Sequence, residues 1–239
     1  MNELQIYHGS NKIITNPQLH LGKIHNDYGQ GFYCTLHYEM ALEWAAKENK
    51  DGFVNEYNLN LSNLKILNLL DEKYNILNWI SILLKNRFFR LNDEIAMAAK
   101  EYIIQNFYID TSKYDVVIGY RADDSYFSYA QSFISNTLPI RNLEKALKLG
   151  QLGTQIVLVS EKAFKQIKFI KSTPVDKNIY YPKFVSRDTK AREEYHNKIK
   201  NDKNFKNDIF VMDILRKEMK NDDIRIQRTI SKWCHTCIS

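Results

Sequence analysis

The stretch LQIYHGS, residues 4–10, opens the chain with alternating apolar and polar side chains, followed by a histidine, a glycine and a serine. The alternation predicts a strand over about residues 3–8. His8, Gly9 and Ser10 are a poor choice for a sheet interior, so the simplest interpretation is a strand end with a turn glycine. Motifs further along the chain favour a functional role for the same three residues.

The composition predicts a folded protein with one sizeable core. The chain has 239 residues, of which 44% are hydrophobic, and at this length a second full domain is not expected. No apolar stretch approaches the length of a membrane span, and residues 1–5 lack the basic and apolar regions of a signal peptide. We therefore expect a cytoplasmic protein without a membrane partner.

The cysteines and the charge give weaker signals. Cys34 stands alone, and Cys234 and Cys237 form one CxxC pair. Because zinc needs four ligands and no second pair is visible, we expect reduced thiols and no metal. Residues 1–171 carry 19 basic and 18 acidic residues, whereas residues 172–239 carry 15 and 10. This basic tail suits nucleic acid, an acidic partner or a solvated helical surface, and its interspersed acidic residues favour the last.

The elements expected from the sequence are mixed without a regular strand–helix–strand alternation, which is typical of the α+β class. We expect a domain over residues 1–171 and a basic helical extension over residues 172–239 packed on it. After the first strand, the expected strands are approximately residues 32–34, 52–61, 64–67, 114–120, 154–160 and 168–170, and the expected longer helices are approximately residues 76–88, 93–107, 124–149, 187–200 and 207–220.

A second motif, DYGQGFYCT at residues 27–35, resembles the first in joining a turn to a short strand. Gly29 and Gly31 mark the turn, and we expect Thr35 to cap a helix that carries Trp44 on one face. Three polar or aromatic residues then stand at strand edges: His8, Tyr33 and Gln155. Residues placed in this way are able to line one cleft.

Together these motifs resemble the diphtheria-toxin and poly(ADP-ribose) polymerase branch of the ADP-ribosyltransferases, which is known by a His-Tyr-Glu triad. The resemblance rests on YHGS, on GQGFYCT with the helix bearing Ala41 and Trp44, and on the late strand that opens with Gln155. With VVIGYRADDSYF and GQLGTQIVLVSEKAF, the chain is also similar to a bacterial domain family of unknown function. Members of that family resemble ADP-ribosyltransferases and often lie in toxin–antitoxin-like operons. The similarity covers about residues 4–171.

The resemblance implies a split β-sheet core with flanking helices and NAD as the substrate. It implies that His8 hydrogen-bonds a ribose hydroxyl and that the Gly9 backbone pairs with the nicotinamide carboxamide, which a side chain would obstruct. It further implies that Tyr33 stacks on the nicotinamide, with Trp44 on the other face of the ring and Ser10 adding a hydroxyl contact. The structural alternative for Tyr33 and Trp44 is that they are ordinary core aromatics.

The third position of the triad departs from the pattern, because Gln155 stands where that branch usually has glutamate. Glutamine supplies no negative charge and cannot act as a general base, so we expect transfer of one unit and not chain elongation. Acceptor activation then needs another group, and Asp123 and Asp124 are the candidates, with a helix N-cap as their alternative role. Arg121 would bind a phosphate or pair with Asp124.

We therefore expect a mono-ADP-ribosyltransferase that moves ADP-ribose from NAD to a protein or nucleic acid, as a toxin or defence effector restrained by a small antitoxin protein. Hydrolysis of NAD by water is a variant of the same activity. The alternatives are a degenerate module that binds NAD or a nucleotide without turnover, and a nucleic-acid-binding protein that uses the basic tail. The remaining histidines follow no ligand spacing, and surface or cap roles suffice for them: His20, His25, His37 and His196.

Overall fold

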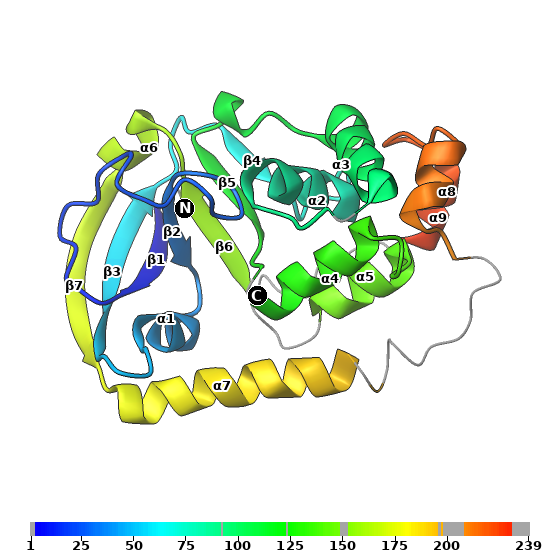
Figure 1. The fold of residues 1–239 in the computed structure, drawn as a ribbon. Coiled ribbons are helices and arrows are strands. Elements are labelled where there is room, and N and C mark those ends of the chain that lie inside the picture. The colour runs from blue at the N-terminus through cyan, green and yellow to red at the C-terminus, as the bar shows by residue number, and fades with distance from the viewer. Residues whose placement is uncertain are drawn as a thin grey trace. The chain divides into compact units, whose positions relative to one another are not determined.

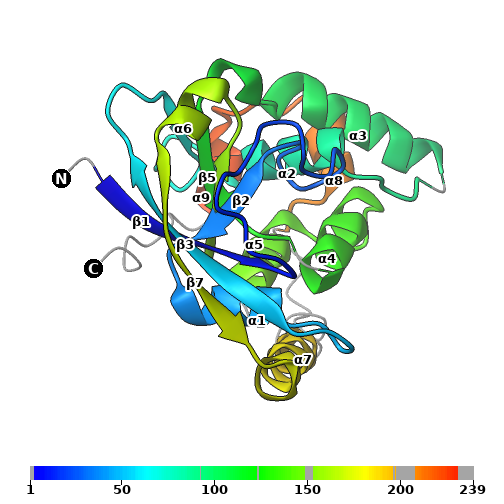
Figure 2. The same cartoon turned by 90° about the vertical axis from the view of Figure 1, so that its left-hand side faces the viewer.

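The computed structural model describes residues 3–91, 93–122, 124–148, 153–195, 197 and 208–230. Its strands form one sheet in the order β4-β5-β6-β2-β1-β3-β7 (Figures 1 and 2). Only β4 and β5 run parallel, and the other neighbours are antiparallel. The expected α+β class is confirmed. The strands are β1 (Glu3–Ser10), β2 (Phe32–Thr35), β3 (Gly52–Asn60), β4 (Ile66–Asn68), β5 (Val116–Tyr120), β6 (Thr154–Leu158) and β7 (Ile167–Val175).

The chain divides into two compact units. The sheet unit comprises residues 1–68, 110–121 and 150–193, and the helical unit comprises residues 69–109, 122–149 and 194–239. The sheet unit holds all the strands with α1 (Tyr38–Ala45), a 3₁₀ turn η1 (Thr111–Lys113), α6 (Glu161–Lys165) and nearly all of α7 (Lys177–Glu194). The helical unit holds α2 (Ile76–Asn86), α3 (Glu94–Phe107), α4 (Asp124–Ile134), α5 (Ile140–Lys148), α8 (Val211–Arg216) and α9 (Ile224–Thr229). The boundary expected between residues 171 and 172 lies inside β7.

Two nearly separate halves of the sheet meet at β1 and β2. Their register consists of a single Cα pair, Tyr7 with Thr35, whereas β1 pairs with β3 along its whole length and β2 pairs with β6 along all of its own. Strands β1 and β2 therefore separate beyond that pair. On the β1 side the sheet continues with β3 and β7, and on the β2 side it continues with β6, β5 and β4.

The two faces of the sheet have different cover. One face carries a core of buried apolar side chains, among which Ile6, Phe32, Tyr57 and Ile156 pack together. On the other face, α1 packs against β3 and the end of β7, and Tyr180 and Tyr181 bring α7 onto the same cluster. In Figure 1 α1 lies between the sheet and the long α7. Burial of each such aliphatic or aromatic side chain stabilises the fold by about 1.5–3 kcal/mol.

The first strand is longer than expected, because Gly9 and Ser10 continue the ladder with β3 to the register pair Ser10–Phe53. The buried side chain of Asn55 provides hydrogen-bond partners for the backbone at the end of this strand and just after it. The Nδ2 group of Asn55 donates to the carbonyls of His8 (3.4 Å) and Lys12 (3.1 Å), and its Oδ1 accepts from the amide of Ile14 (3.0 Å). The chain after β1 is thus held by a side chain of β3, which alternation alone does not reveal.

Several expected helices are wrong in extent. The single helix expected over 124–149 is two, because Asn136 takes a left-handed conformation (φ 57°) and Pro139 precedes α5. The helix expected at about 187–200 begins earlier, as α7 at Lys177, and residues 198–200 lie outside the described ones. The helix expected at about 207–220 is the shorter α8, and residue 207 lies outside the described ones. Pro182 lies inside α7, and proline is ordinarily a helix breaker, so the pattern concealed this helix.

Helix α3 begins as expected, with Asp93 as its cap: the carboxylate accepts from the Ala96 amide at 2.7 Å. The expected cap Thr35 is wrong, because His37 occupies the N-cap position of α1. Among the described residues, no helix is both long enough and apolar enough to cross a membrane.

Candidate functional site

The predicted residues lie around the point where β1 and β2 part, most of them on the α1 side of the sheet unit and two of them on its other face. Thr35 is opposite Tyr7 in β1 and opposite Gln155 in β6. Residues directly opposite or two apart on a strand share a face of the sheet, so the register places Gly9, Tyr33 and Gln155 on one face. It places His8 and Ser10 on the opposite face of β1.

Gly9 allows α1 to cross close over β1. A Cβ atom on Gly9 would lie 2.2 Å from the Ala41 carbonyl oxygen, 2.7 Å from the Ala45 nitrogen and 2.8 Å from Trp44 Cβ. Any side chain would displace the helix that carries Trp44. Gly9 is thus required for the close packing of α1 on β1, a role that the sequence alone does not show.

Gln155 is buried, with 6% of its surface exposed, and its Oε1 has no hydrogen-bond partner among the described residues. A buried acceptor without a partner costs about 1–3 kcal/mol. Its cross-strand neighbours are Thr35 on one side and Gly119 on the other. Such an acceptor is suited to a donor group that arrives with a ligand.

Trp44 also has a buried polar atom without a partner, in this case a donor: its Nε1 makes no hydrogen bond within the described residues. The guanidinium carbon of Arg121 lies 4.3 Å from the centre of the indole, a cation–π contact worth about 0.5–2 kcal/mol. Arg121 directly follows β5 and is therefore part of the site on its α1 side, where sequence reasoning gave it only a phosphate or a carboxylate as partner.

Tyr33 organises the turn before its own strand. Its hydroxyl donates to the Gly29 carbonyl at 2.6 Å and accepts from the Tyr28 amide at 3.1 Å. The Tyr28 hydroxyl in turn donates to the Tyr120 carbonyl at 2.7 Å. Gly29 has the positive φ (79°) that the turn requires. The ring of Tyr33 is only partly buried, which leaves the predicted stacking role open to it.

His8 joins the two strands just beyond their single register pair. Its Nδ1 lies 2.6 Å from the Tyr33 carbonyl oxygen, and its ring stacks on Phe32 with centroids 4.5 Å apart. A carbonyl only accepts, so Nδ1 carries the proton and the neutral ring keeps Nε2 as an acceptor. Burial lowers the pKa of His8, an effect that the bond to Tyr33 opposes. Neutral His8 is therefore suited to accept from a hydroxyl.

The other predicted residues are less closely joined to this group. The Ser10 hydroxyl accepts from the Lys12 amide at 3.4 Å, a local turn contact. Asp123 lies outside the described residues, and Asp124 begins α4 in the helical unit with its side chain also outside them. Their predicted role in acceptor activation stays a prediction.

The sequence predicts a surface or cap role for His37, and the structure adds a contact that the sequence does not show. His37 holds the N-cap position of α1, yet its side chain makes no capping bond. Its ring lies against Gly153, where an added Cβ would be 3.0 Å from His37 Cδ2. Spacing in the sequence offers no signal for this contact, because residues 37 and 153 meet only through the β2–β6 pairing.

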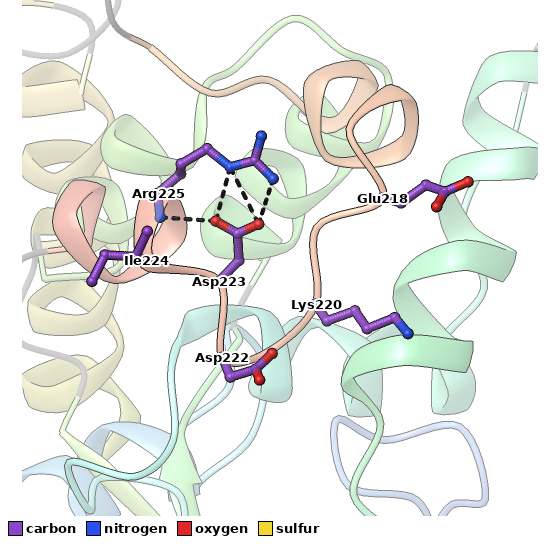
Figure 3. Close-up of a pocket in the computed structure, with 6 residues that line it drawn as sticks. All are labelled: Glu218, Lys220, Asp222, Asp223, Ile224 and Arg225. Atoms are coloured by element: carbon purple, nitrogen blue, oxygen red, sulfur yellow. Dashed lines mark hydrogen bonds and ion pairs between the residues drawn. The ribbon is translucent and has the colours of Figure 1, made fainter.

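Figure 3 shows a separate surface hollow in the helical unit, lined by Glu218, Lys220, Asp222, Asp223, Ile224 and Arg225. Its main feature is an internal ion pair, in which Arg225 holds Asp223 at 2.5 Å. The hydrogen bond from Arg225 lowers the pKa of Asp223 to about 2. This hollow contains none of the predicted site residues. No cluster of three metal-ligating side chains occurs in the described part of the chain, and Cys234 and Cys237 lie outside it.

Comparisons with known proteins place the chain in a family. Neither the comparison with curated proteins nor that with solved structures found a match. A family model described as protein of unknown function (DUF3990) matches residues 4–169. The match includes His8, Tyr33, Trp44 and Gln155, and it ends inside β7. Because it covers more than half of the chain, this protein belongs to the DUF3990 family of proteins of unknown function.

Proposed function

We propose that this protein is a cytoplasmic mono-ADP-ribosyltransferase that takes NAD as substrate and transfers ADP-ribose to a macromolecule. The observation that carries the proposal is that two buried polar atoms on the α1 side of the sheet unit have no partners among the described residues, the donor Trp44 Nε1 and the acceptor Gln155 Oε1. Native proteins seldom leave such atoms unpaired without a functional reason. NAD offers groups of both kinds, a carboxamide carbonyl that accepts and amide or ribose hydroxyl groups that donate.

The remaining residues fit the same substrate. Neutral His8, on the other face of β1 where β1 and β2 part, presents Nε2 as an acceptor for a ribose hydroxyl, and on the α1 side Tyr33 and Trp44 supply flat surfaces for a pyridinium ring. Arg121 keeps a positive charge beside Trp44, which suits the pyrophosphate. The substrate supplies a glycosidic bond to a good leaving group, and the protein's task is to hold that bond and position the acceptor. Gln155 orients by hydrogen bonding without charge, which favours transfer of a single unit.

The test is incubation of the full chain with NAD labelled on its adenylate phosphate, in a bacterial lysate, with nicotinamide and macromolecular label followed together. His8→Ala is the test variant, and His25→Ala, at an exposed histidine, is its matched control. We expect label on a protein or nucleic acid in the parent and in His25→Ala, and its loss in His8→Ala. Nicotinamide release without label would instead identify an NAD glycohydrolase.

A second candidate is a module that binds NAD without turnover, and the absence of a carboxylate at Gln155 is the observation that favours it. Binding of NAD by calorimetry, with no nicotinamide released in any condition, would establish this alternative. Salt-sensitive retention on DNA or RNA without NAD binding would favour a nucleic-acid-binding protein.

As a biological role we propose a toxin or defence effector held in check by a small partner protein, which rests on the resemblance of the motifs. Expression of the chain alone in a bacterium is then expected to slow growth, and His8→Ala to restore it. Equal growth of the two strains at equal protein levels would contradict this role.

A further inference from the structure

The proposed reaction leaves one chemical task without a residue: an acceptor hydroxyl, amine or water must lose a proton as it attacks. Gln155 has no basic atom for this purpose. We propose that His37 is the general base that takes the proton from the acceptor, an inference that rests on the proposed transferase function.

The main chain places His37 two residues beyond Thr35, the β2 partner of Gln155. Thr35 lies directly opposite Gln155 in the β2–β6 ladder. The Thr35 hydroxyl accepts from the His37 amide at 3.2 Å, which fixes the turn between β2 and α1. His37 is then the last residue before α1, with an extended backbone (φ −99°, ψ 110°). Its position therefore depends on the same ladder that positions Gln155.

The side chain of His37 lies over the entry to β6. A Cβ on Gly153 would lie 3.0 Å from His37 Cδ2 and 3.7 Å from Nε2, and Gly153 precedes Gln155 by two residues. Gly153 also has a positive φ of 69°, which favours glycine. The imidazole thus occupies the space that a side chain two positions before Gln155 would take.

The ring is also chemically available. His37 is exposed, the N-cap bond that it could have made is absent, and no hydrogen bond to its ring is formed within the described residues. On α1, the carboxylate of Glu43 is engaged with Arg187 at 2.7 Å, and the exposed Glu39 lies in the first turn. Histidine is the side chain best matched to proton transfer near neutral pH.

The proton balance is simple. The acceptor's lone pair forms a bond to C1′ of the nicotinamide ribose as the bond from C1′ to the nicotinamide nitrogen breaks, and that electron pair neutralises the pyridinium. The acceptor's proton passes to a ring nitrogen of His37, which becomes imidazolium. Because the ring is exposed, the proton then leaves to solvent, and neutral His37 is restored.

The experiment compares acceptors that carry a proton with one that does not. Nicotinamide release by the full chain is measured with water or lysate as acceptor and, separately, with azide, an anionic nucleophile from which no proton must be removed. His37→Gln is the test variant and His25→Gln its control, and NAD binding to each is measured by calorimetry. His37→Ala with added imidazole provides a second route to the same base.

We expect His37→Gln to lower release with water and lysate by roughly 100-fold, to leave release with azide and the NAD affinity close to those of the parent, and we expect imidazole to restore part of the activity of His37→Ala. Equal losses with all acceptors, or no loss at all, would overturn the role of His37 while leaving the transferase proposal intact. A parent chain that releases no nicotinamide with any acceptor would overturn both.

Discussion

Gly9 has a strictly steric role that can be tested separately from catalysis. Alanine at this position would place its Cβ 2.2 Å from the Ala41 carbonyl oxygen, so α1 must move or β1 must bend. We expect Gly9→Ala to lower the free energy of unfolding by about 1–3 kcal/mol, as measured by urea denaturation. Ser10→Ala, at the next residue, is the control and is expected to stay within about 0.5 kcal/mol of the parent. Equal stability of Gly9→Ala and the parent would refute the close crossing.

His8 makes stability depend on pH. Burial lowers its pKa in the folded protein below the ordinary value of 6.5, so the unfolded chain binds more protons at this site. Its contribution to stability is therefore complete above about pH 6.5 and decreases as the pH falls below that value. We expect the parent to lose more stability than His8→Asn between about pH 7.5 and about pH 5.5 in urea titrations. Parallel losses in the two proteins would show that His8 is not the group responsible.

A substitution at Gln155 is expected to increase the rate of the proposed reaction. A carboxylate at this position would hydrogen-bond a ribose hydroxyl and favour the positive charge that develops on the sugar. Under the proposed function, Gln155→Glu is expected to raise nicotinamide release about tenfold or more, since about 1.4 kcal/mol of transition-state stabilisation suffices for that factor. Gln155→Leu, which has neither charge nor an acceptor, is expected to lower release. A Glu variant no faster than the Leu variant would contradict the assigned position.

Among the elements, α7 is held on α1 by an ion pair as well as by its tyrosines. Arg187 and Glu43 are 2.7 Å apart with side chains 16% and 14% exposed. A charge that loses such a partner stays largely buried, so we expect Glu43→Gln to lower the free energy of unfolding by about 1.5–3 kcal/mol. Glu161→Gln is the control, because its pair with Lys165 is 79% exposed on both sides and exposed pairs contribute about 0–1 kcal/mol. Thermal denaturation of both variants tests the difference.

The elements also show how far the sequence could be interpreted. The α+β class, the strands around residues 116–120 and 154–158 and the start of α3 follow from local patterns, because alternation, apolar runs and a cap are short-range signals. The start of α7 could not be predicted, since Pro182 argues against a helix and only packing on α1 outweighs it. The extension of β1 through Ser10 was missed for a similar reason, because the compensating amide comes from Asn55 on another strand.

The candidate site divides in the same way. Short motifs in the sequence indicate four candidate residues: His8, Tyr33, Trp44 and Gln155. The strand register then places β1 beside β2 and β2 beside β6, and α1 packs closely on β1. The stacking of Arg121 on Trp44 and the contact of His37 with Gly153 join residues far apart in the sequence. Such contacts are determined by strand order, which no single local pattern contains.

At the scale of the whole molecule, the region matched by the family model ends before the last strand of the sheet does. The matched region ends at residue 169, but β7 continues to Val175, and its pairs with β3 extend to Gly52. A chain ending at residue 169 would lose most of this edge strand and the tyrosines of α7 that cover α1. We expect it to lack the cooperative thermal transition of the full chain, as measured by circular dichroism, whereas a chain ending at residue 195 retains the sheet unit. A cooperative transition in the shorter chain would show that β7 and α7 are dispensable.

The strand order also determines when the candidate site can exist during synthesis. The strands β1, β2 and β3 all lie within residues 3–60, so the β1–β3 pairing closes a short loop. The second neighbour of β2 is β6, at residues 154–158, and pairing across so long a loop is slow and entropically costly. Until β6 has left the exit tunnel, Gln155 and the contact between His37 and Gly153 are absent. Under the proposed function, a nascent chain is therefore expected to attack NAD only after residues 154–158 have emerged.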